Sequence, residues 1–132
     1  MVALLLIVFY YIFVESTSTK ISAMELANYY SKDKQAADNK FLNKEIEING
    51  RVKAYFDYEF ESDLLELISE SGKISVFCIL LNDEQVNKAK KLTQGTEVII
   101  KGRCLGMTKN KFPNSVYVRV EKLIQWRFIR KK

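Results

Sequence analysis

The sequence predicts a single, mainly β domain with a few helices. Between Glu45 and Leu123, apolar and polar residues alternate in five strand-like runs, and one helical run separates the third strand from the fourth. A period of two is typical of strands with one buried face. Five strands with a helix between the third and the fourth is the order of an OB-fold, a small Greek-key barrel. We therefore expect a five-stranded OB-fold barrel, preceded by one or two N-terminal helices.

Two glycines inside the predicted strands favour this fold. The runs EIEINGRV (45–52) and EVIIKGRC (97–104) contain Gly50 and Gly102, each in the inward-facing series. The first strand of such a barrel is strongly coiled and pairs with the second strand along one half and the fourth along the other. A residue without Cβ relieves crowding on the concave side of the bend. We expect both glycines on paired strands; unrelated glycines in an ordinary sheet are the alternative.

The chain begins with an apolar leader, residues 1–14, in which no side chain is charged. As a helix, the run VALLLIVFYYIFV would span about 20 Å, against roughly 30 Å of bilayer hydrocarbon. That length suits a secretory signal, but no basic residue precedes the run, so an anchor that starts upstream of Met1 is also consistent. We expect a membrane anchor or export signal, with the domain outside the cytoplasm. A buried element of the domain is the alternative.

Two helices are expected before the barrel. Residues 15–21, ESTSTKI, are expected to be a polar linker to a domain at 22–126. The S-x-x-E sequence at 22–25 is a capping box, which starts a helix. Asp33 is suited to cap a second helical segment that extends to about Leu42. Because no Gly or Pro interrupts this stretch, we expect two helices with a tight corner or one bent helix.

The first strand, from Glu45 to about Phe56, has the clearest alternation. We predict an inward set of Ile46, Ile48, Val52, Ala54 and Phe56, and an outward set of Glu47, Asn49, Arg51, Lys53 and Tyr55. The second and third strands are expected at 64–69 and about 74–81, with a Ser-Gly turn signal at 71–72 between them.

The helix between the third and fourth strands is expected at 83–94. Asn82 and Gln85 form a capping pair at its start, and lysines occupy its last turns, where the helix dipole favours cations. Gly95 is a typical residue to end it. The fourth strand, the following loop and the fifth strand are expected at 97–105, 106–115 and about 116–123.

Side chains needed for several kinds of chemistry are absent. The chain has no histidine and only two cysteines, Cys78 and Cys104, so it cannot assemble a four-ligand Cys/His zinc site or a histidine-activated nucleophile. No spacing forces carboxylates such as Glu59 and Asp63 into a catalytic pair. We therefore expect no enzymatic activity, no metal and no cofactor. Both cysteines fall in inward series as free core thiols; a disulfide is the alternative, which export would favour.

The net charge of +5 comes from the end of the chain. Four of the 21 basic residues lie in a tail at 127–132, which leaves 17 basic against 16 acidic residues before it. A nearly neutral body disfavours a nucleic-acid ligand, which is usually bound by a basic patch on the folded domain. The tail itself is either a tether to anionic lipid or nucleic acid or a solvated end.

OB-folds bind ligands on the face of the second and third strands and in two loops, after the first and the fourth strand. The candidate ligand-binding residues are basic or aromatic and lie at outward positions or in the second loop: Arg51, Lys53, Tyr55, Phe77, Lys101, Arg103, Lys109, Lys111 and Phe112. A solvated surface is the alternative, because exposed strand positions are polar whatever the function. The first loop carries four carboxylates (Asp57, Glu59, Glu61 and Asp63), which would repel a phosphate backbone.

Five segments of the chain carry a family resemblance: ISAMEL, KQAADNKFLNKEIEINGRV, VFCILLND, KAKKLTQGTEVIIKGRCLG and VYVRVEKL. Together they resemble the bacterial OB-fold family described as tRNA anticodon-binding-like, over residues 21 to about 124 and most specifically at 88–106. The resemblance implies an N-terminal signal or anchor, a helical lead-in and an OB-fold, but no activity and no functional residues. Members often have a further cysteine in the last strand, near Glu121 here, so a family disulfide through Cys104 lacks that partner.

The sequence therefore predicts a non-enzymatic OB-fold binding module that is membrane-anchored or exported. The expected ligand is a protein, a peptide or an oligosaccharide, and the membrane is contacted through the N-terminus. A single-stranded nucleic-acid binder that faces the cytoplasm is the alternative.

Overall fold

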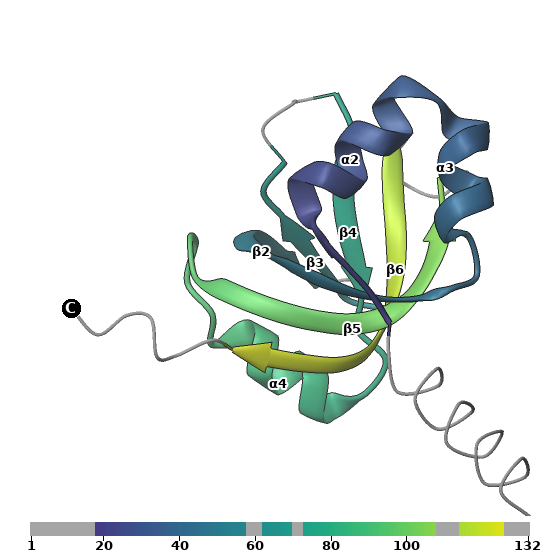
Figure 1. Ribbon diagram of the computed structural model, residues 1–132. Coiled ribbons are helices and arrows are strands. Elements are labelled where there is room, and N and C mark those ends of the chain that lie inside the picture. The colour runs from purple at the N-terminus through teal and green to yellow at the C-terminus, as the bar shows by residue number, and fades with distance from the viewer. Residues whose placement is uncertain (1–17, 58–61, 70–72, 108–113, 126–132) are drawn as a thin grey trace, which may run out of the picture.

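The computed structural model describes residues 18–57, 62–69, 73–107 and 114–125, whose strands form one sheet closed into a barrel (Figure 1). The described elements are β1 (Thr19–Ser22), α2 (Ala23–Lys32), α3 (Lys34–Phe41), β2 (Glu45–Phe56), β3 (Leu64–Leu67), β4 (Ser75–Ile79), α4 (Asp83–Lys90), β5 (Glu97–Gly106) and β6 (Ser115–Gln125). The sheet order is β1-β2-β3-β4-β6-β5, and pairing of β2 with β5 closes the barrel. The predicted five-stranded OB-fold is confirmed.

Strand β2 closes the barrel because it changes partner along its length. Its first half, Glu45–Arg51, pairs antiparallel with β5, and its second half, Val52–Phe56, pairs with β3. In the β2–β5 register Gly50 lies opposite Val98, and Gly102 lies opposite Ile46. The two glycines therefore lie on paired strands, as predicted.

The two glycines permit different close approaches. A Cβ at Gly102 would overlap the carbonyl oxygen of Arg119, at a bulge in the β5–β6 pair. A Cβ at Gly50 would lie 3.1 Å from the Cβ of Ala23, the first residue of α2. Gly102 thus allows two strands to pack closely, whereas Gly50 leaves room for the start of a helix over β2.

A bulge in β2 reverses the facing of its last residues. The β2–β3 register shifts once, which places Tyr55 opposite Leu65 and Phe56 opposite Leu64. Leu65 and Tyr55 belong to the barrel core, whereas Leu64 and Phe56 belong to a cluster on the outer face. The predicted inward positions of Ala54 and Phe56 and the outward position of Tyr55 are wrong, because an extra residue moves every later side chain to the opposite face.

The chain enters the barrel through a strand that the sequence did not predict. The expected linker at 15–21 ends in β1, which pairs in parallel with β2, with Thr19 opposite Ile46. Ile21 is its one buried side chain. Four residues with a single apolar position are too few for the alternation of a strand to be recognised.

Helices α2 and α3 cover one end of the barrel, joined by the predicted tight corner (Figure 1). The Ser22 hydroxyl accepts a hydrogen bond from the Glu25 amide at 3.0 Å, and the Glu25 carboxylate accepts one from the Ser22 amide at 3.1 Å. Asp33 caps α3 by accepting hydrogen bonds from the amides of Gln35 and Ala36. Both predicted caps are confirmed.

Helix α4 covers the opposite end of the barrel (Figure 1). The Asn82 side chain caps it by accepting a hydrogen bond from the Gln85 amide at 2.9 Å. The buried Gln85 side chain donates to the carbonyl oxygen of Val120 at 3.1 Å, at the point where β6 has parted from β4. The helix ends at Lys90, about one turn earlier than predicted.

Buried side chains form two clusters. The larger fills the barrel and the space under α2, and includes both cysteines. The smaller lies outside the barrel on β3, β4 and β6, where Leu64, Phe77 and Tyr117 are buried beside Phe56, Ile79 and Leu105. An apolar cluster on the outer face means that β6 is buried on both sides around Tyr117, whereas its outward residues from Arg119 on are exposed.

Cys78 and Cys104 are free thiols in the larger cluster. Burial raises the pKa of the Cys78 thiol to about 12 and also raises that of Cys104. The Cys104 sulfur lies 3.7 Å from the hydroxyl of Tyr30, which donates to Asp38 at 2.8 Å. Both thiols are therefore protonated packing groups at neutral pH.

Candidate functional site

Two of the predicted ligand-binding cations on β2 are engaged by carboxylates. Arg51 forms an ion pair with Glu97 of β5, and Lys53 forms one with Glu66 of β3, each at 3.4 Å. The Glu66 side chain is only 9% exposed, so Lys53 balances a nearly buried charge. These two cations are neutralised within the barrel surface.

The two predicted cations on β5 have a different surrounding, because they lie opposite further cations of β6. Lys101 lies opposite Lys122, and Arg103 lies opposite Arg119. Like charges directly opposite on an antiparallel pair are unfavourable. Among the described residues, none of the four makes an ion pair within 4.0 Å. We call Lys101, Arg103, Arg119 and Lys122 the cation array.

Three carboxylates border the cation array. Glu45 and Glu47 of β2 lie opposite its two β5 members, and Glu121 projects from the β5–β6 bulge. A hydrogen bond to Glu45 raises the pKa of Glu121, and the two arginines of the array oppose that shift. With Lys20 of β1, which lies opposite Glu47, this outer face has five cations against three carboxylates.

The aromatic candidates on the strands are not available for stacking. Phe77 is 3% exposed and stacks on Tyr117, with ring centroids 5.7 Å apart and an interplanar angle of 21°. Phe56 packs against the Phe77 ring, with ring centroids 5.9 Å apart. Tyr55 lies against the barrel core and donates its hydroxyl to Asp63; burial, together with that carboxylate, raises its pKa. These rings are therefore engaged in packing within the protein, although Phe77 lies opposite Glu66, the ion-pair partner of Lys53.

The residues not predicted from the sequence are Phe56 and Tyr117 of the outer cluster and Arg119 and Lys122 of the cation array. Phe56 was hidden by the bulge. Alternation in VYVRVEKL places Arg119 outward but Lys122 inward; the bulge at Glu121 turns Lys122 outward, and only the β5–β6 register shows that both residues face cations. The predicted Lys109, Lys111 and Phe112 lie outside the described residues, as do the leader and the basic tail.

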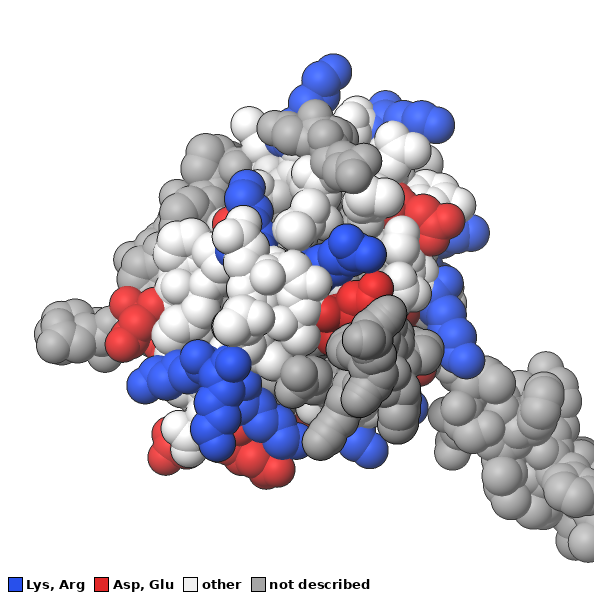
Figure 2. All heavy atoms as spheres, turned by 90° about the vertical axis from the view of Figure 1, so that its left-hand side faces the viewer, with Lys and Arg blue, Asp and Glu red and all other residues white. Residues whose placement is uncertain are grey.

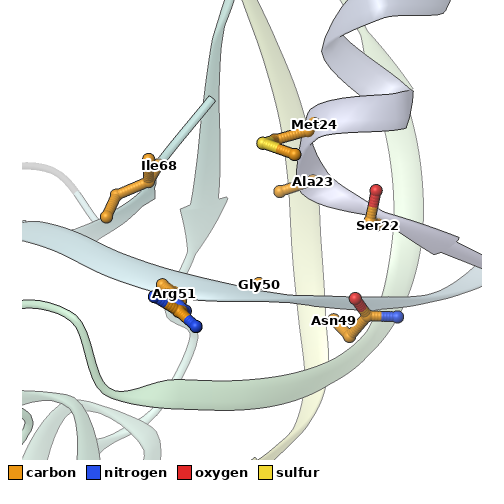
Figure 3. Close-up of a pocket in the computed structure, with 7 residues that line it drawn as sticks. All are labelled: Ser22, Ala23, Met24, Asn49, Gly50, Arg51 and Ile68. Atoms are coloured by element: carbon orange, nitrogen blue, oxygen red, sulfur yellow. The ribbon is translucent and has the colours of Figure 1, made fainter. Parts of the chain in front are cut away.

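A groove of about 440 Å³ lies between β2 and the start of α2 (Figure 3). Its lining consists of Ser22, Ala23, Met24, Asn49, Gly50, Arg51 and Ile68. Met24 and Ile68 lie on opposite sides of it, above the bare backbone of Gly50 (Figure 3). Met24 is 46% exposed. The groove therefore has apolar walls, with Asn49 and Arg51 at its lower rim.

A second hollow, of about 600 Å³, adjoins the first along β2 and β5. The two share the segment Asn49–Arg51, and the second adds Lys20, Glu47 and Glu97 to the rim. Figure 2 shows one face of the molecule, on which Lys and Arg neighbour Asp and Glu around uncharged surface. The hollows thus combine apolar walls with charges of both signs.

The described residues contain neither a metal centre nor a membrane-spanning helix. No three of their Cys, Asp or Glu side chains are grouped to hold a metal ion. Within the same residues, none of the helices has the length and apolar character needed to cross a bilayer.

The closed barrel and its surface grooves define an OB-fold binding domain. The chain belongs to the tRNA_anti-like family, whose model matches residues 3–116. This is a family of binding domains, and the resemblance noted in the sequence is confirmed. Among curated proteins no match is found.

Solved structures share the fold at low sequence identity. The OBody AM3L09 bound to hen egg-white lysozyme has 18% identity and a TM-score of 0.55, over 65% of this chain and 84% of the other. A putative aspartyl-tRNA synthetase from Leishmania major Friedlin has 14% identity and a TM-score of 0.60, over 83% of this chain and 21% of the other.

The asparaginyl-tRNA synthetase from Pyrococcus horikoshii, complexed with asparaginyl-adenylate, has 23% identity and a TM-score of 0.51, over 65% of this chain and 20% of the other. The chain thus spans about a fifth of the length of either synthetase. These likenesses concern the fold.

Proposed function

We propose that this chain is a non-enzymatic binding module, membrane-anchored or exported, and that its ligand is a segment of a protein or peptide partner. The observation that carries the proposal is the groove beside Gly50 (Figure 3), which joins apolar walls to a polar rim. Its volume of about 440 Å³ suits a few side chains of an extended segment. Met24, a flexible thioether, adapts well to different apolar partners.

The charges around the groove favour a protein ligand over a polyanion. Arg51, the cation on its lower rim, already pairs with Glu97. A phosphate backbone would have to displace that carboxylate, whereas a peptide segment of mixed charge would not. The solved OBody bound to hen egg-white lysozyme is an OB-fold with a protein on its surface, so the fold is compatible with this kind of ligand.

The nucleic-acid alternative has less support in the described residues. Single-strand binders need exposed ring faces and a basic path for the backbone. Here Phe77 and Tyr117 are 3% and 1% exposed. The cation array adjoins the outer cluster, since Arg119 follows Tyr117 by two residues on β6 and lies opposite Ile79, but the Phe77 and Tyr117 rings beside it are buried.

The location rests on the leader, residues 1–14, which lies outside the described residues. Its uninterrupted apolar sequence supports an anchor or export signal. An alkaline phosphatase fused after Lys132 is active only outside the cytoplasm. We expect an active fusion, and an inactive one would contradict the proposed location.

A photo-crosslinking amino acid at Met24 tests the proposed ligand class in cells. Leu81 is the matched control, because it is similarly exposed, at 50% against 46%, but lies beside α4 at the other end of the barrel. We expect a discrete crosslinked protein from position 24 and none from position 81. Crosslinks to no protein, or equal crosslinks from both positions, would contradict a ligand in the groove.

Filter binding to a single-stranded oligonucleotide tests the nucleic-acid alternative. Tight binding that weakens steeply with salt and is unaffected by Met24→Asp would favour a nucleic-acid ligand. We expect no such binding.

A further inference from the structure

The cation array brings like charges together on two neighbouring strands, and within the described residues only Arg103 among its members is held by a side-chain hydrogen bond, which it donates to the carbonyl oxygen of Asn43 at 2.6 Å. On β5–β6 the array sets Lys101 against Lys122 and Arg103 against Arg119, with no ion pair within 4.0 Å among the described residues. Such cross-strand repulsion is relieved when an external anion lies between the side chains. The neighbouring carboxylates of β2 and the bulge reduce the excess positive charge but do not cancel it, since five cations on this face meet three acids.

The place where the leader joins the barrel is set by β1. Because β1 pairs in parallel with β2, with Thr19 opposite Ile46, one step upstream places residue 18 beside Glu45. Glu45 in turn lies opposite Arg103, and Arg103 opposite Arg119. Neighbouring strands are about 4.8 Å apart. The chain therefore leaves the barrel about 10 Å from the first arginine of the array.

Little chain separates this exit from the apolar leader. Residues 15–18 connect Val14 to β1, and four extended residues span at most about 14 Å. The seven-residue linker expected from the sequence would have left the barrel free to turn. Because β1 takes up its last residues, the face that carries the array stays close to whatever surface holds the leader.

We propose that the cation array binds the anionic headgroups of the membrane in which the leader is anchored, and so orients the barrel on that membrane. The proposal rests on the membrane anchoring given under Proposed function. Lys and Arg close to an anionic surface each raise affinity by about fivefold. Phosphate and carboxylate groups of lipids suit both the Lys ammonium and the forked Arg guanidinium.

Apolar residues beside the array suit the same surface. Ile124, 37% exposed, follows the Lys122 position by two residues and lies opposite Ile99. The sequence after β6, WRFIRKK (126–132), continues with aromatic, aliphatic and basic residues. Basic residues combined with apolar ones are the composition of segments that lie at a membrane interface.

Lysine labelling of the full-length protein tests the proposal directly. The protein is reconstituted with phosphatidylcholine vesicles, with or without phosphatidylserine, and treated with an amine-acylating reagent. Mass spectrometry then measures labelling at Lys101 and Lys122, with Lys32 and Lys34 of the α2–α3 end as internal controls. We expect phosphatidylserine to slow labelling of the first two about fivefold or more, high salt to restore it, and the controls to be unchanged.

A pair of variants with equal charge change separates the array from net charge. Lys20 of β1 is exposed on the same face and serves as reporter. Its protection by phosphatidylserine should be lost in Lys101→Gln/Lys122→Gln and kept in Lys32→Gln/Lys34→Gln. Loss in both variants would mean that overall charge, and not the array, holds the barrel on the surface, which overturns the proposal.

Three further outcomes are distinguishable. If the protein floats with phosphatidylcholine vesicles but Lys101 and Lys122 are labelled equally with and without phosphatidylserine, the array does not contact lipid while the anchor stands. If the protein does not float with either vesicle, the anchoring itself fails, and the orientation proposal fails with it. Protection by a single-stranded oligonucleotide but not by phosphatidylserine would assign the array to nucleic acid and overturn the proposal.

Discussion

Strand β5 has opposite charge relations with its two neighbours. Towards β2, charged residues that lie opposite each other are of unlike sign, as Arg103 with Glu45 and Glu97 with Arg51. Towards β6, they are of like sign, as Lys101 with Lys122. Unlike pairs stabilise a strand pair and like pairs weaken it. The β2–β5 contact is therefore built to close the barrel, whereas the β5–β6 surface keeps charges that the barrel alone would not favour.

The largest loss of stability is expected from a substitution that disrupts the β5–β6 contact itself. Gly102→Ala places a Cβ on the carbonyl oxygen of Arg119, and backbone cannot yield as a flexible side chain can. We expect the free energy of unfolding to fall by about 3 kcal/mol or more, measured by urea denaturation. Gly50→Ala, whose Cβ would lie 3.1 Å from that of Ala23, should cost about 1 kcal/mol or less. Equal, small losses would mean that β5 and β6 are not held so closely.

A smaller loss of stability is expected when like charges are placed opposite each other on β2 and β5, as they already are on β5 and β6. Glu97→Lys removes the ion pair with Arg51 and sets two cations opposite each other. Because both side chains are partly exposed, we expect a loss of about 0.5–1 kcal/mol in the free energy of unfolding. Glu97→Gln, which only removes the pair, should lose less. A gain in stability from Glu97→Lys would show that unlike pairing does not support this contact.

The converse substitution should strengthen the β5–β6 surface. Lys122→Glu places a carboxylate opposite Lys101, and we expect the free energy of unfolding to rise by about 0.5 kcal/mol at low salt. Lys34→Glu is the matched control, because it changes net charge equally but breaks the ion pair with Asp38. A Lys122→Glu protein that is more stable, and whose lysines phosphatidylserine no longer protects from labelling, would show that the array binds lipid at a cost in stability. A destabilised one would contradict the repulsion inferred from the register.

The smallest expected effect lies where the two contacts meet, at the carboxyl groups of Glu45 and Glu121. The pKa of Glu121 is raised in the folded protein, mainly by its hydrogen bond to Glu45. The folded state therefore binds its proton more tightly than the unfolded state does, so stability falls as pH rises from the usual glutamate range through the raised folded pKa. Glu121→Gln should remove this decline, measured by urea denaturation over that range. An unchanged pH dependence in Glu121→Gln would show that the hydrogen bond to Glu45 does not raise the pKa of Glu121.

Most of the fold could be predicted because it depends on local patterns. Alternation located five strands, Ser22 with Glu25 and Asp33 located the helix starts, and the positions of Gly50 and Gly102 indicated the paired strands. Strand β1 was missed, since four residues around Ile21 carry too little periodicity. The facing of Tyr55 and Phe56 was wrong, since a bulge leaves no clear mark in an alternating sequence.

The candidate site could be predicted only in part. Arg51, Lys53, Lys101 and Arg103 were selected as one outward stripe, because alternation assigns them all to the outside. Which of them form an ion pair and which face another cation depends on residues such as Glu66, Glu97 and Lys122, which lie on other strands. The groove beside Gly50 depends on the packing of α2 over β2, which the capping box starts but does not direct.

The sequence by itself determined that this chain closes a five-stranded barrel, because hydrophobic period, caps and glycines act between near neighbours. Only the tertiary structure decided which charges meet. Register and bulges set cross-strand neighbours between residues far apart in the chain, and a shift of one residue turns a side chain to the other face and gives it another partner.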